Sequence, residues 1–393
     1  MQPRAVTYFE RDFDFETHAM EVEASWDPSL GGGPAPEVAV RMRPKTSPDV
    51  DGERHLAVGA SETIIRSAPS SCEGDGESTR RGPRSCRAAE LTSGSKGSTT
   101  EAQAGTWDDF HRQHKGGTFF KERRYLLAEF PCLASAGRTT SVLEIGCGSG
   151  SSCLPVLRAN PTAAVIACDF SAAAVECARR AVADADAQLC VAAADPPTPS
   201  FSERFCAFVC DPAVDDLAAA THRELAKLGL SSLPPRLDAV LMVFVLSAVP
   251  LDDIPRFLAS VFRALKPGGV VCFRDYGVYD LPMLRFPPDQ RLGDRLYVRG
   301  DGTLAHFFTV EDVRRRFEEA GFVEGAGDCE AGTVGIEQRA AADAEGRGEE
   351  EDAAVRYCCV HNENKRKGIV MRRVFVHGTW TKPLASSRSA GSE

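Results

Sequence analysis

The feature that most constrains the fold is the stretch 141–152, SVLEIGCGSGSS, in which three glycines follow an apolar run at alternate positions. The apolar run predicts a buried strand, and the small residues after it predict a tight turn that opens a helix. Gly146, Gly148 and Gly150 allow backbone conformations and close approaches that a side chain would forbid. A strand, such a turn and a helix in succession are typical of ligand sites in α/β folds.

Strand and helix patterns alternate around this turn, which indicates a parallel sheet covered by helices on both faces. A helical lead-in is predicted at 107–130, and the segment 278–309 looks irregular. Strands are expected at SVLEIG, AVIACDF, RFCAFVCD, RLDAVLMV and VVCFRDYG, with two late strands near FVEGAG and RRVFVHGTW. Helices are expected at about 151–159, 172–185, 252–265 and 310–321.

The ends of the chain differ in composition from its middle. Residues 1–105 are rich in Ser, Gly, Pro and charge without a sustained period, so we expect a disordered extension. We expect one globular α/β domain at 106–383, interrupted by an acidic low-complexity insertion at 335–354, and a disordered tail at 384–393. The insertion carries seven acids against two arginines, so half of the net charge of −10 sits there and a nucleic-acid partner stays open.

Targeting and redox signals are weak. No apolar run is long enough to cross a bilayer, and the acidic start lacks a hydrophobic signal segment. We therefore expect a cytoplasmic protein with no membrane association. The alternative is a protein that is also present in the nucleus. The 14 cysteines are scattered without a CxxC pair, which favours reduced thiols.

Two acids follow the next two predicted strands. Asp169 ends AVIACD, 23 residues after Gly146, where a carboxylate would hold the two hydroxyls of a ribose. Asp211 ends the strand after that. Ser151 stands where a dinucleotide fingerprint has a third glycine or alanine, so the match to that pattern is imperfect. A tight turn with capping carboxylates and a pyridine-nucleotide site remain the alternatives.

The pattern E-x-G-x-G-x-G resembles the first motif of class I methyltransferases that use S-adenosylmethionine. This resemblance implies a Rossmann-like α/β fold with a mostly parallel seven-stranded sheet and one antiparallel strand. It also implies S-adenosyl-L-methionine as cofactor and S-adenosyl-L-homocysteine as product. The cofactor-binding residues that it implies are Glu144, Gly146, Gly148, Gly150, Asp169 and Asp211.

A more specific resemblance covers about 107–333 and 364–383. The segments FFKER, LEIGCGSG, CDFS, FVLSAV, LKPGG, RDYGVYD and YVRGDGT occur in this order. The series resembles the enzymes that make 3-methylcytidine in the anticodon loop of tRNA, which implies methylation at position 32. Relatives differ in tRNA choice, and some depend on an aminoacyl-tRNA synthetase or another tRNA-selecting helper.

The chemistry of this reaction suggests which side chains to examine. N3 of neutral cytosine carries a free lone pair, so catalysis needs alignment, exclusion of water and negative potential near the base rather than a strong base. Asp275 in FRDYG is our first catalytic candidate, with a loop cap or a partner for Arg274 as the alternative. Ser247 in FVLSAV is the second.

Cations interleaved with aromatic rings suggest two RNA-binding segments, because cations hold phosphates and rings stack on unpaired bases. An amphipathic surface helix is the alternative for the first segment. The chain departs from the family at Leu304 and His306, where relatives carry arginine and tyrosine. His111 and His114 lack a second ligand pair, so we expect no metal site. The RNA-binding candidates are Phe119, Phe120, Lys121 and Arg123 in the lead-in, and Arg285, Phe286, Tyr297 and Arg299 in 278–309.

Two other functions remain open. One is a class I methyltransferase that acts on a protein or a small molecule. The other is a scaffold that binds S-adenosylmethionine without turnover. The intact glycine and aspartate set argues against the scaffold, and the arginine–aromatic segment argues for RNA over a small molecule.

Overall fold

The computed structural model describes residues 12–27, 33–34, 40–42, 98–113, 121–134, 140–192, 200–229, 237–325, 354–364 and 368–384. Most of the extension expected to be disordered lies outside these ranges, as do residues 335–353 of the acidic insertion and 385–393 of the tail. Within the extension, however, helix α1 (Phe15–Ala24) and the first residues of α3 (Ser98–Gln113) are ordered elements. The expectation of disorder up to residue 105 is therefore corrected at these two helices and at the short strands between residues 26 and 42.

Seven strands form the continuous path of the central sheet, in the order β12-β14-β8-β7-β4-β5-β6. Strands β4 to β8 pair in parallel, whereas β14 runs antiparallel to both β8 and β12. This confirms the predicted α/β sheet with one antiparallel strand. The bounds are Ser141–Ile145 for β4, Ala164–Asp169 for β5, Phe205–Val209 for β6, Leu237–Val243 for β7, Leu265–Tyr276 for β8, Val323–Glu324 for β12 and Ile369–Thr381 for β14.

Two further strands extend the sheet beyond the expected set. β13 (Val355–Asn364) forms a long hairpin with β14, and β3 (Val40–Met42) pairs with the far end of β14. Neither was predicted, because β13 directly follows the acidic segment and β3 lies in the polar N-terminal region.

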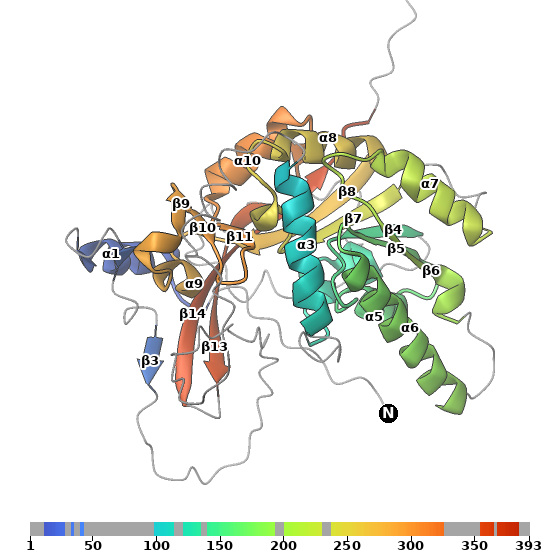
Figure 1. The fold of residues 1–393 in the computed structure, drawn as a ribbon, viewed down its shortest axis with the longest axis horizontal. Helices are drawn as coiled ribbons and strands as arrows, with labels where there is room; N and C mark the ends of the chain where they lie inside the picture. Colours follow the sequence, from blue (N-terminus) through green and yellow to red (C-terminus); the bar gives the residue numbers. More distant parts are fainter. Residues whose placement is uncertain are drawn as a thin grey trace, which may run out of the picture.

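Helices cover both faces of the sheet (Figure 1). α5 (Cys153–Ala159) and α6 (Ala172–Ala192) lie on one face, and α7 (Leu217–Lys227), α8 (Ile254–Ala264) and α10 (Val310–Glu319) lie on the other. α3 packs against α6.

Strand alternation produces a separate hydrophobic core on each face. In β4, Val142 packs in the core that includes Leu154 of α5, while its neighbour Leu143 packs in the core that includes Leu258 of α8. Successive side chains of a strand point to opposite faces, so a continuous apolar strand such as SVLEI fits a sheet buried on both sides.

No described helix is long and apolar enough to cross a membrane.

The segment 278–309 is an ordered lobe rather than the irregular connection expected. It contains α9 (Leu281–Leu284) and a three-stranded sheet of β9 (Arg291–Gly293), β10 (Leu296–Val298) and β11 (Leu304–His306). A third hydrophobic core fills it. α1 packs against the same lobe, because Phe15 lies against this core and His18 Nε2 is 3.1 Å from the carbonyl oxygen of Tyr279. Short strands β1 (Trp26–Asp27) and β2 (Gly33–Pro34) pair with each other nearby in the chain.

Candidate functional site

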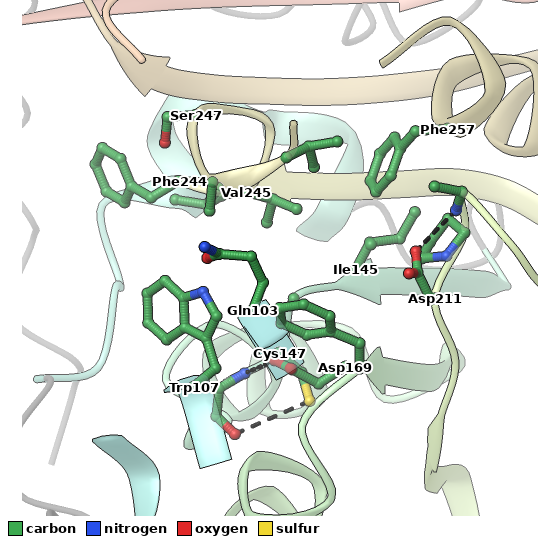
Figure 2. Close-up of a pocket in the computed structure, with 18 of the residues that line it drawn as sticks. Gln103, Trp107, Ile145, Cys147, Asp169, Asp211, Phe244, Val245, Ser247 and Phe257 are labelled. Atoms are coloured by element: carbon green, nitrogen blue, oxygen red, sulfur yellow. Dashed lines mark hydrogen bonds between the residues drawn. The ribbon is translucent and has the colours of Figure 1, made fainter. Parts of the chain in front are cut away.

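A pocket with a cavity volume of about 160 Å³ lies at the carboxyl ends of β4, β5, β6, β7 and β8 and opens partly to solvent. Parallel α/β sheets place ligands at this edge, where the loops leave the strands. Figure 2 shows side chains from several of these strand ends, together with two from α3, facing the same space. The pocket has a half near β5 and β6 and a half near β7, β8 and the small lobe.

The glycine turn forms the floor of the first half. Gly146 and Gly148 line the pocket with φ of +67° and +52°, in the left-handed region that L side chains rarely adopt. A Cβ on Gly146 would lie 2.5 Å from Cγ2 of Val245, so the turn and the β7 exit loop can only meet here because the residue is glycine.

Gly150 and Glu144 support the turn from behind and do not line the pocket. Gly150 lies against the backbone of Ala178 in α6. A Cβ added to Gly150 would be 3.4 Å from the Ala178 Cα, so this glycine allows close packing of the turn on the helix. Glu144 is fully buried and accepts a hydrogen bond from the Cys153 thiol at 2.6 Å. Burial raises the pKa of Glu144. The structure thus corrects the prediction that these two residues contact the cofactor.

Asp169 lies in the pocket at the end of β5 and is held by backbone. Its Oδ2 accepts from the Gly148 N–H and its Oδ1 from the Ser171 N–H, each at 3.0 Å. These bonds tie the carboxylate to both the glycine turn and the start of α6, where the Ser171 hydroxyl accepts from the Ala174 N–H. Burial outweighs the two backbone bonds and raises the pKa of Asp169 to about 6. A carboxylate retains lone pairs beyond these two bonds, so it can still accept from a diol.

Asp211 follows β6 and also lines the pocket. Its Oδ1 accepts from Ala213 N–H at 2.9 Å, and its other oxygen makes no hydrogen bond within the described ranges. Burial raises its pKa. Phe257 lies close to it in Figure 2, and Pro212 also lines this part of the pocket. An acceptor beside apolar side chains suits a flat heteroaromatic ring that carries an amine.

Helix α3 covers the pocket along one side. Its residues Gln103, Trp107 and His111, spaced by four, all face the pocket. Asp108 anchors the helix, because its Oδ1 accepts from the Ser171 hydroxyl at 2.6 Å and from the Ala173 N–H at 3.1 Å. The role of this helix was not predicted, since its first half looks polar and irregular in sequence.

The second half of the pocket has an aromatic wall. Phe244, just after β7, stacks on Tyr276 of β8 with ring centroids 4.9 Å apart. Phe244 has φ of +59°, an uncommon conformation for a residue with a side chain. Guanidinium groups flank this pair, with Arg123 at 5.4 Å from the Phe244 ring and Arg299 at 5.7 Å from the Tyr276 ring. Sequence reasoning missed both rings, although they stand in the motifs FVLSAV and FRDYG.

Asp275 does not face the pocket, contrary to the prediction. It is completely buried, and its two oxygens accept backbone N–H groups from Ser247 at 3.0 Å and from Tyr276 at 2.8 Å. Burial raises its pKa to about 6. Ser247 lies in the short helix η5 (Leu246–Ala248) and does line the pocket. Asp275 is therefore a positioning residue that holds η5 and Tyr276 in place.

The predicted RNA-binding residues lie in different environments. Lys121, Arg285 and Arg123 are exposed or partly exposed, and Arg123 reaches the pocket. Phe286 stacks on Tyr297 at 4.7 Å, and Tyr297 is buried in the small lobe, so this pair is core and not a free stacking platform. Arg299 lines the pocket and donates to Oγ1 of Thr303 at 3.2 Å. Phe119 and Phe120 lie outside the described residues.

The two departures from the family also face inward. Leu304 is buried, and His306 is buried with its Nε2 3.6 Å from a carboxylate oxygen of Asp312. His111 packs edge-on against Phe110 and near Trp107, and His114 lies outside the described residues. Within the described ranges no group of three metal-ligating side chains comes together.

The residues present fit S-adenosylmethionine. The buried carboxylate of Asp169 can accept from a ribose diol, and Asp211 with Phe257 can hold an adenine and its amine. The left-handed glycines leave the turn without side chains where the methionine part would pass. Ser151 stands where a dinucleotide fingerprint has its third glycine or alanine, which favours the sulfonium cofactor over the pyridine-nucleotide alternative.

A match to a family model agrees with this assignment. A family model described as a methyltransferase domain matches residues 119–323, more than half of the chain. A solved S-adenosylmethionine-dependent methyltransferase from Anabaena variabilis matches with 13% identity and a TM-score of 0.45, covering 71% of this chain and 94% of that chain.

Curated relatives are closer in sequence. Human tRNA N(3)-cytidine methyltransferase METTL6 is 32% identical over 289 residues, which cover 72% of this chain and 81% of that protein. Drosophila melanogaster tRNA N(3)-methylcytidine methyltransferase Mettl2 is 36% identical over 227 residues, 56% of this chain and 61% of that protein. Yeast tRNA(Thr) (cytosine(32)-N(3))-methyltransferase is 34% identical over 230 residues, 57% of this chain and 32% of that protein. With the site described above, these matches show that the chain belongs to the tRNA N(3)-cytidine methyltransferase family of S-adenosylmethionine-dependent enzymes.

Proposed function

We propose that this chain methylates N3 of a cytidine in tRNA, and that the target is cytidine 32 of the anticodon loop. Position 32 appears in the name of the yeast relative, and the ordered motifs resemble enzymes that act in this loop. The activity on tRNA follows from family membership. The position is the finer part of the proposal.

One observation carries the proposal: the cofactor half and the aromatic half belong to one continuous pocket. Asp169 and Asp211 lie at one end, and the stacked rings of Phe244 and Tyr276 lie at the other. An unstacked base could rest on such rings while its edge faces the cofactor. A flipped pyrimidine needs this arrangement, because its reacting atom is hidden in stacked RNA.

S-adenosylmethionine supplies an electrophilic methyl group on a sulfonium. The chain's own residues orient the base, exclude water and shape the potential. Asp275 is ionised at pH values well above its pKa of about 6, so it adds negative potential behind Ser247 and Tyr276, where the methylated base becomes cationic. No side chain needs to remove a proton from N3, because neutral cytosine presents a lone pair there.

The RNA backbone would be held around the mouth of the pocket. Lys121, Arg285 and Arg291 are exposed. Lys121 is two residues before Arg123 of the pocket, and the other two belong to the small lobe that supplies Arg299 to it. Cations of this kind bind phosphates without reading sequence. A helper that selects the tRNA, such as an aminoacyl-tRNA synthetase, is part of the proposal, as is a location in the cytoplasm, with the nucleus as an additional site.

The test is an assay with purified full-length chain, labelled S-adenosylmethionine and total tRNA, followed by digestion to nucleosides. The expected result is label in 3-methylcytidine, lost when a transcript carries uridine at position 32. Label in another nucleoside, in protein or in a small molecule contradicts the proposal. Adding cell extract to a parallel reaction supplies any helper, so absence of label in both reactions would leave only a binding scaffold.

A further inference from the structure

Gln103 is a buried polar side chain that the cofactor site does not use. It lies in α3, is 1% exposed and lines the pocket beside Trp107. Figure 2 shows its amide on the side of the pocket that carries Phe244 and Val245.

One side of the Gln103 amide is bound to the small lobe. Nε2 donates to the carbonyl oxygen of Gly302 at 3.2 Å, in the loop between β10 and β11. A carbonyl can only accept, so reversing the amide would place two acceptors against each other. The Gly302 contact therefore determines that Nε2 faces the lobe and that Oε1 is the other, available end.

The other side of the amide lacks a partner. Oε1 of Gln103 is buried and makes no hydrogen bond to any part of the chain that the structure describes, and the same is true of Nε1 of Trp107. An unsatisfied buried polar atom is costly, so two of them in one pocket point to a ligand that satisfies both. The pair presents one acceptor and one donor.

Gln103 lies at the acceptor end of the pocket rather than the cofactor end. His111 lies by the glycine turn, where Cε1 is 3.6 Å from a hypothetical Cβ of Gly148. Gln103 is eight residues earlier, about 12 Å away along the helix axis at 1.5 Å per residue. It contacts the small lobe that also supplies Arg299 to the pocket. The cofactor's methionine part is therefore distant from the amide.

We propose that Gln103 is a specificity-determining residue that accepts a hydrogen bond from the exocyclic amine of the target cytosine, and so places the neighbouring N3 toward the cofactor. This inference rests on the proposed function and names the contact that reads the base. The amine is adjacent to N3, so fixing the amine fixes the reacting edge. Uracil has an oxygen at this position, which the Gln103 oxygen would repel.

The test uses Gln103→Leu, which removes the acceptor, and Gln113→Leu as the matched control. Gln113 is exposed on the same helix, so its substitution changes the same chemistry away from the pocket. Each protein is assayed on a tRNA with cytidine at the target position and on the same tRNA with the pyrimidin-2-one riboside there. That analogue keeps N3 and O2 and lacks the amine.

On the cytidine substrate, Gln103→Leu is expected to lower kcat/KM by about ten- to a hundredfold, whereas Gln113→Leu changes it less than about twofold. Removing the amine should lower kcat/KM of the unsubstituted chain and of Gln113→Leu by a larger factor than that of Gln103→Leu. The difference in intrinsic reactivity of N3 between the two bases is the same for all three proteins, so it cancels in this cycle.

A coupling of about fivefold or more between amine and Gln103 supports the inference. Independent effects, with a coupling below about twofold, overturn it. The dissociation constant of S-adenosylmethionine, expected within about twofold for all variants, shows that Gln103→Leu is folded; if this binding is lost, Gln103→Met replaces it. If the unsubstituted chain labels no cytidine at all while it binds the cofactor, the proposed function fails first and this inference falls with it.

Discussion

The two halves of the pocket are built in different ways. The cofactor half consists of residues at the ends of consecutive strands β4, β5 and β6, joined by backbone hydrogen bonds such as Gly148 N–H to Asp169. The aromatic half takes Trp107 from α3, Arg123 from the lead-in, Phe244 and Tyr276 from two strand ends and Arg299 from the small lobe. One half is local to a single βαβ series, and the other depends on segments far apart in sequence.

This difference predicts which property, cofactor binding or turnover, a substitution in each half should affect. Substitutions in the cofactor half remove groups that contact S-adenosylmethionine directly, so they should abolish cofactor binding. Changes in the aromatic half alter how several segments meet, so they should leave cofactor affinity intact and reduce turnover. The variants below test this separation, beginning with the largest expected effect.

Asp169→Ala should raise the dissociation constant of S-adenosylmethionine more than about a hundredfold. The substitution removes the acceptor for the ribose diol and also the bonds to the Gly148 and Ser171 N–H groups. Isothermal titration calorimetry measures the loss. Binding within about threefold of the unsubstituted chain would contradict the placement of the ribose at Asp169.

Gly146→Ala should lower the free energy of unfolding by about 2–4 kcal/mol and weaken cofactor binding at least about tenfold. Its Cβ would lie 2.5 Å from Cγ2 of Val245. Gly229→Ala is the matched control, because Gly229 has a similar φ of +70° with no atom within 4 Å of a Cβ. The control should cost only about 1–2 kcal/mol for the left-handed backbone and leave binding unchanged. Denaturant unfolding and calorimetry measure both; equal losses in the two variants would show that the contact with Val245 is unimportant.

Cofactor affinity should fall about tenfold between pH 7 and pH 5, because only ionised Asp169 accepts two hydroxyl donors. Burial raises the pKa of this carboxyl to about 6, so it gains a proton as the pH falls through 6, earlier than an ordinary aspartate would. The measurement is the dissociation constant in a series of buffers at constant ionic strength. An affinity that is flat from pH 7 to pH 5 would contradict this assignment.

Asp275→Asn should reduce kcat about tenfold while the cofactor dissociation constant stays within about twofold. The amide presents one donor group to two backbone N–H donors, from Ser247 and Tyr276, so η5 and the Tyr276 ring lose their fixed position. Single-turnover assays and calorimetry separate the two quantities. A normal kcat would show that Asp275 does not position the aromatic half. Lost cofactor binding would show that the two halves do not act separately.

Arg285→Ala should have the smallest effect, a two- to fivefold increase in KM for tRNA with kcat unchanged, and about one unit less in the slope of log affinity against log salt. Arg285 is exposed in the small lobe, which also supplies Arg299 to the pocket. Arg223→Ala is the control, since Arg223 is exposed on α7, which lies on the opposite side of the molecule from the small lobe in Figure 1. The same salt slope for Arg285→Ala and the unsubstituted chain would exclude a phosphate contact there.

Much of the fold and of the cofactor half could be predicted from the sequence. Runs such as SVLEI and AVIACD mark buried parallel strands, and the acids that follow them meet at one edge because parallel strands end there together. Asp169 and Asp211 accordingly lie in the pocket. Glu144 and Gly150 carry the same motif but face the core and α6, because alternation along a strand and the path of a turn decide which side a residue shows.

The small lobe shows the opposite case. Arginines and aromatic rings in 278–309 predicted an RNA surface, yet Phe286 and Tyr297 pack with Phe307 inside the lobe. Composition cannot tell a ring that stacks on a base from a ring that stacks on another ring, since both need the same apolar face. The lobe's core also includes Phe15 from α1, more than 260 residues earlier in the chain.

By itself, then, the sequence determined the parallel sheet and the position of the ligand edge, because these depend on local periodicity and on where each strand ends, whereas the cofactor was implied by a resemblance of motifs. Only the tertiary structure decided that α3 covers the pocket, that Asp275 lies behind its wall and that Gln103 presents an unsatisfied oxygen inside it. Those properties depend on which distant segments meet, and burial of a polar atom exists only once they have met.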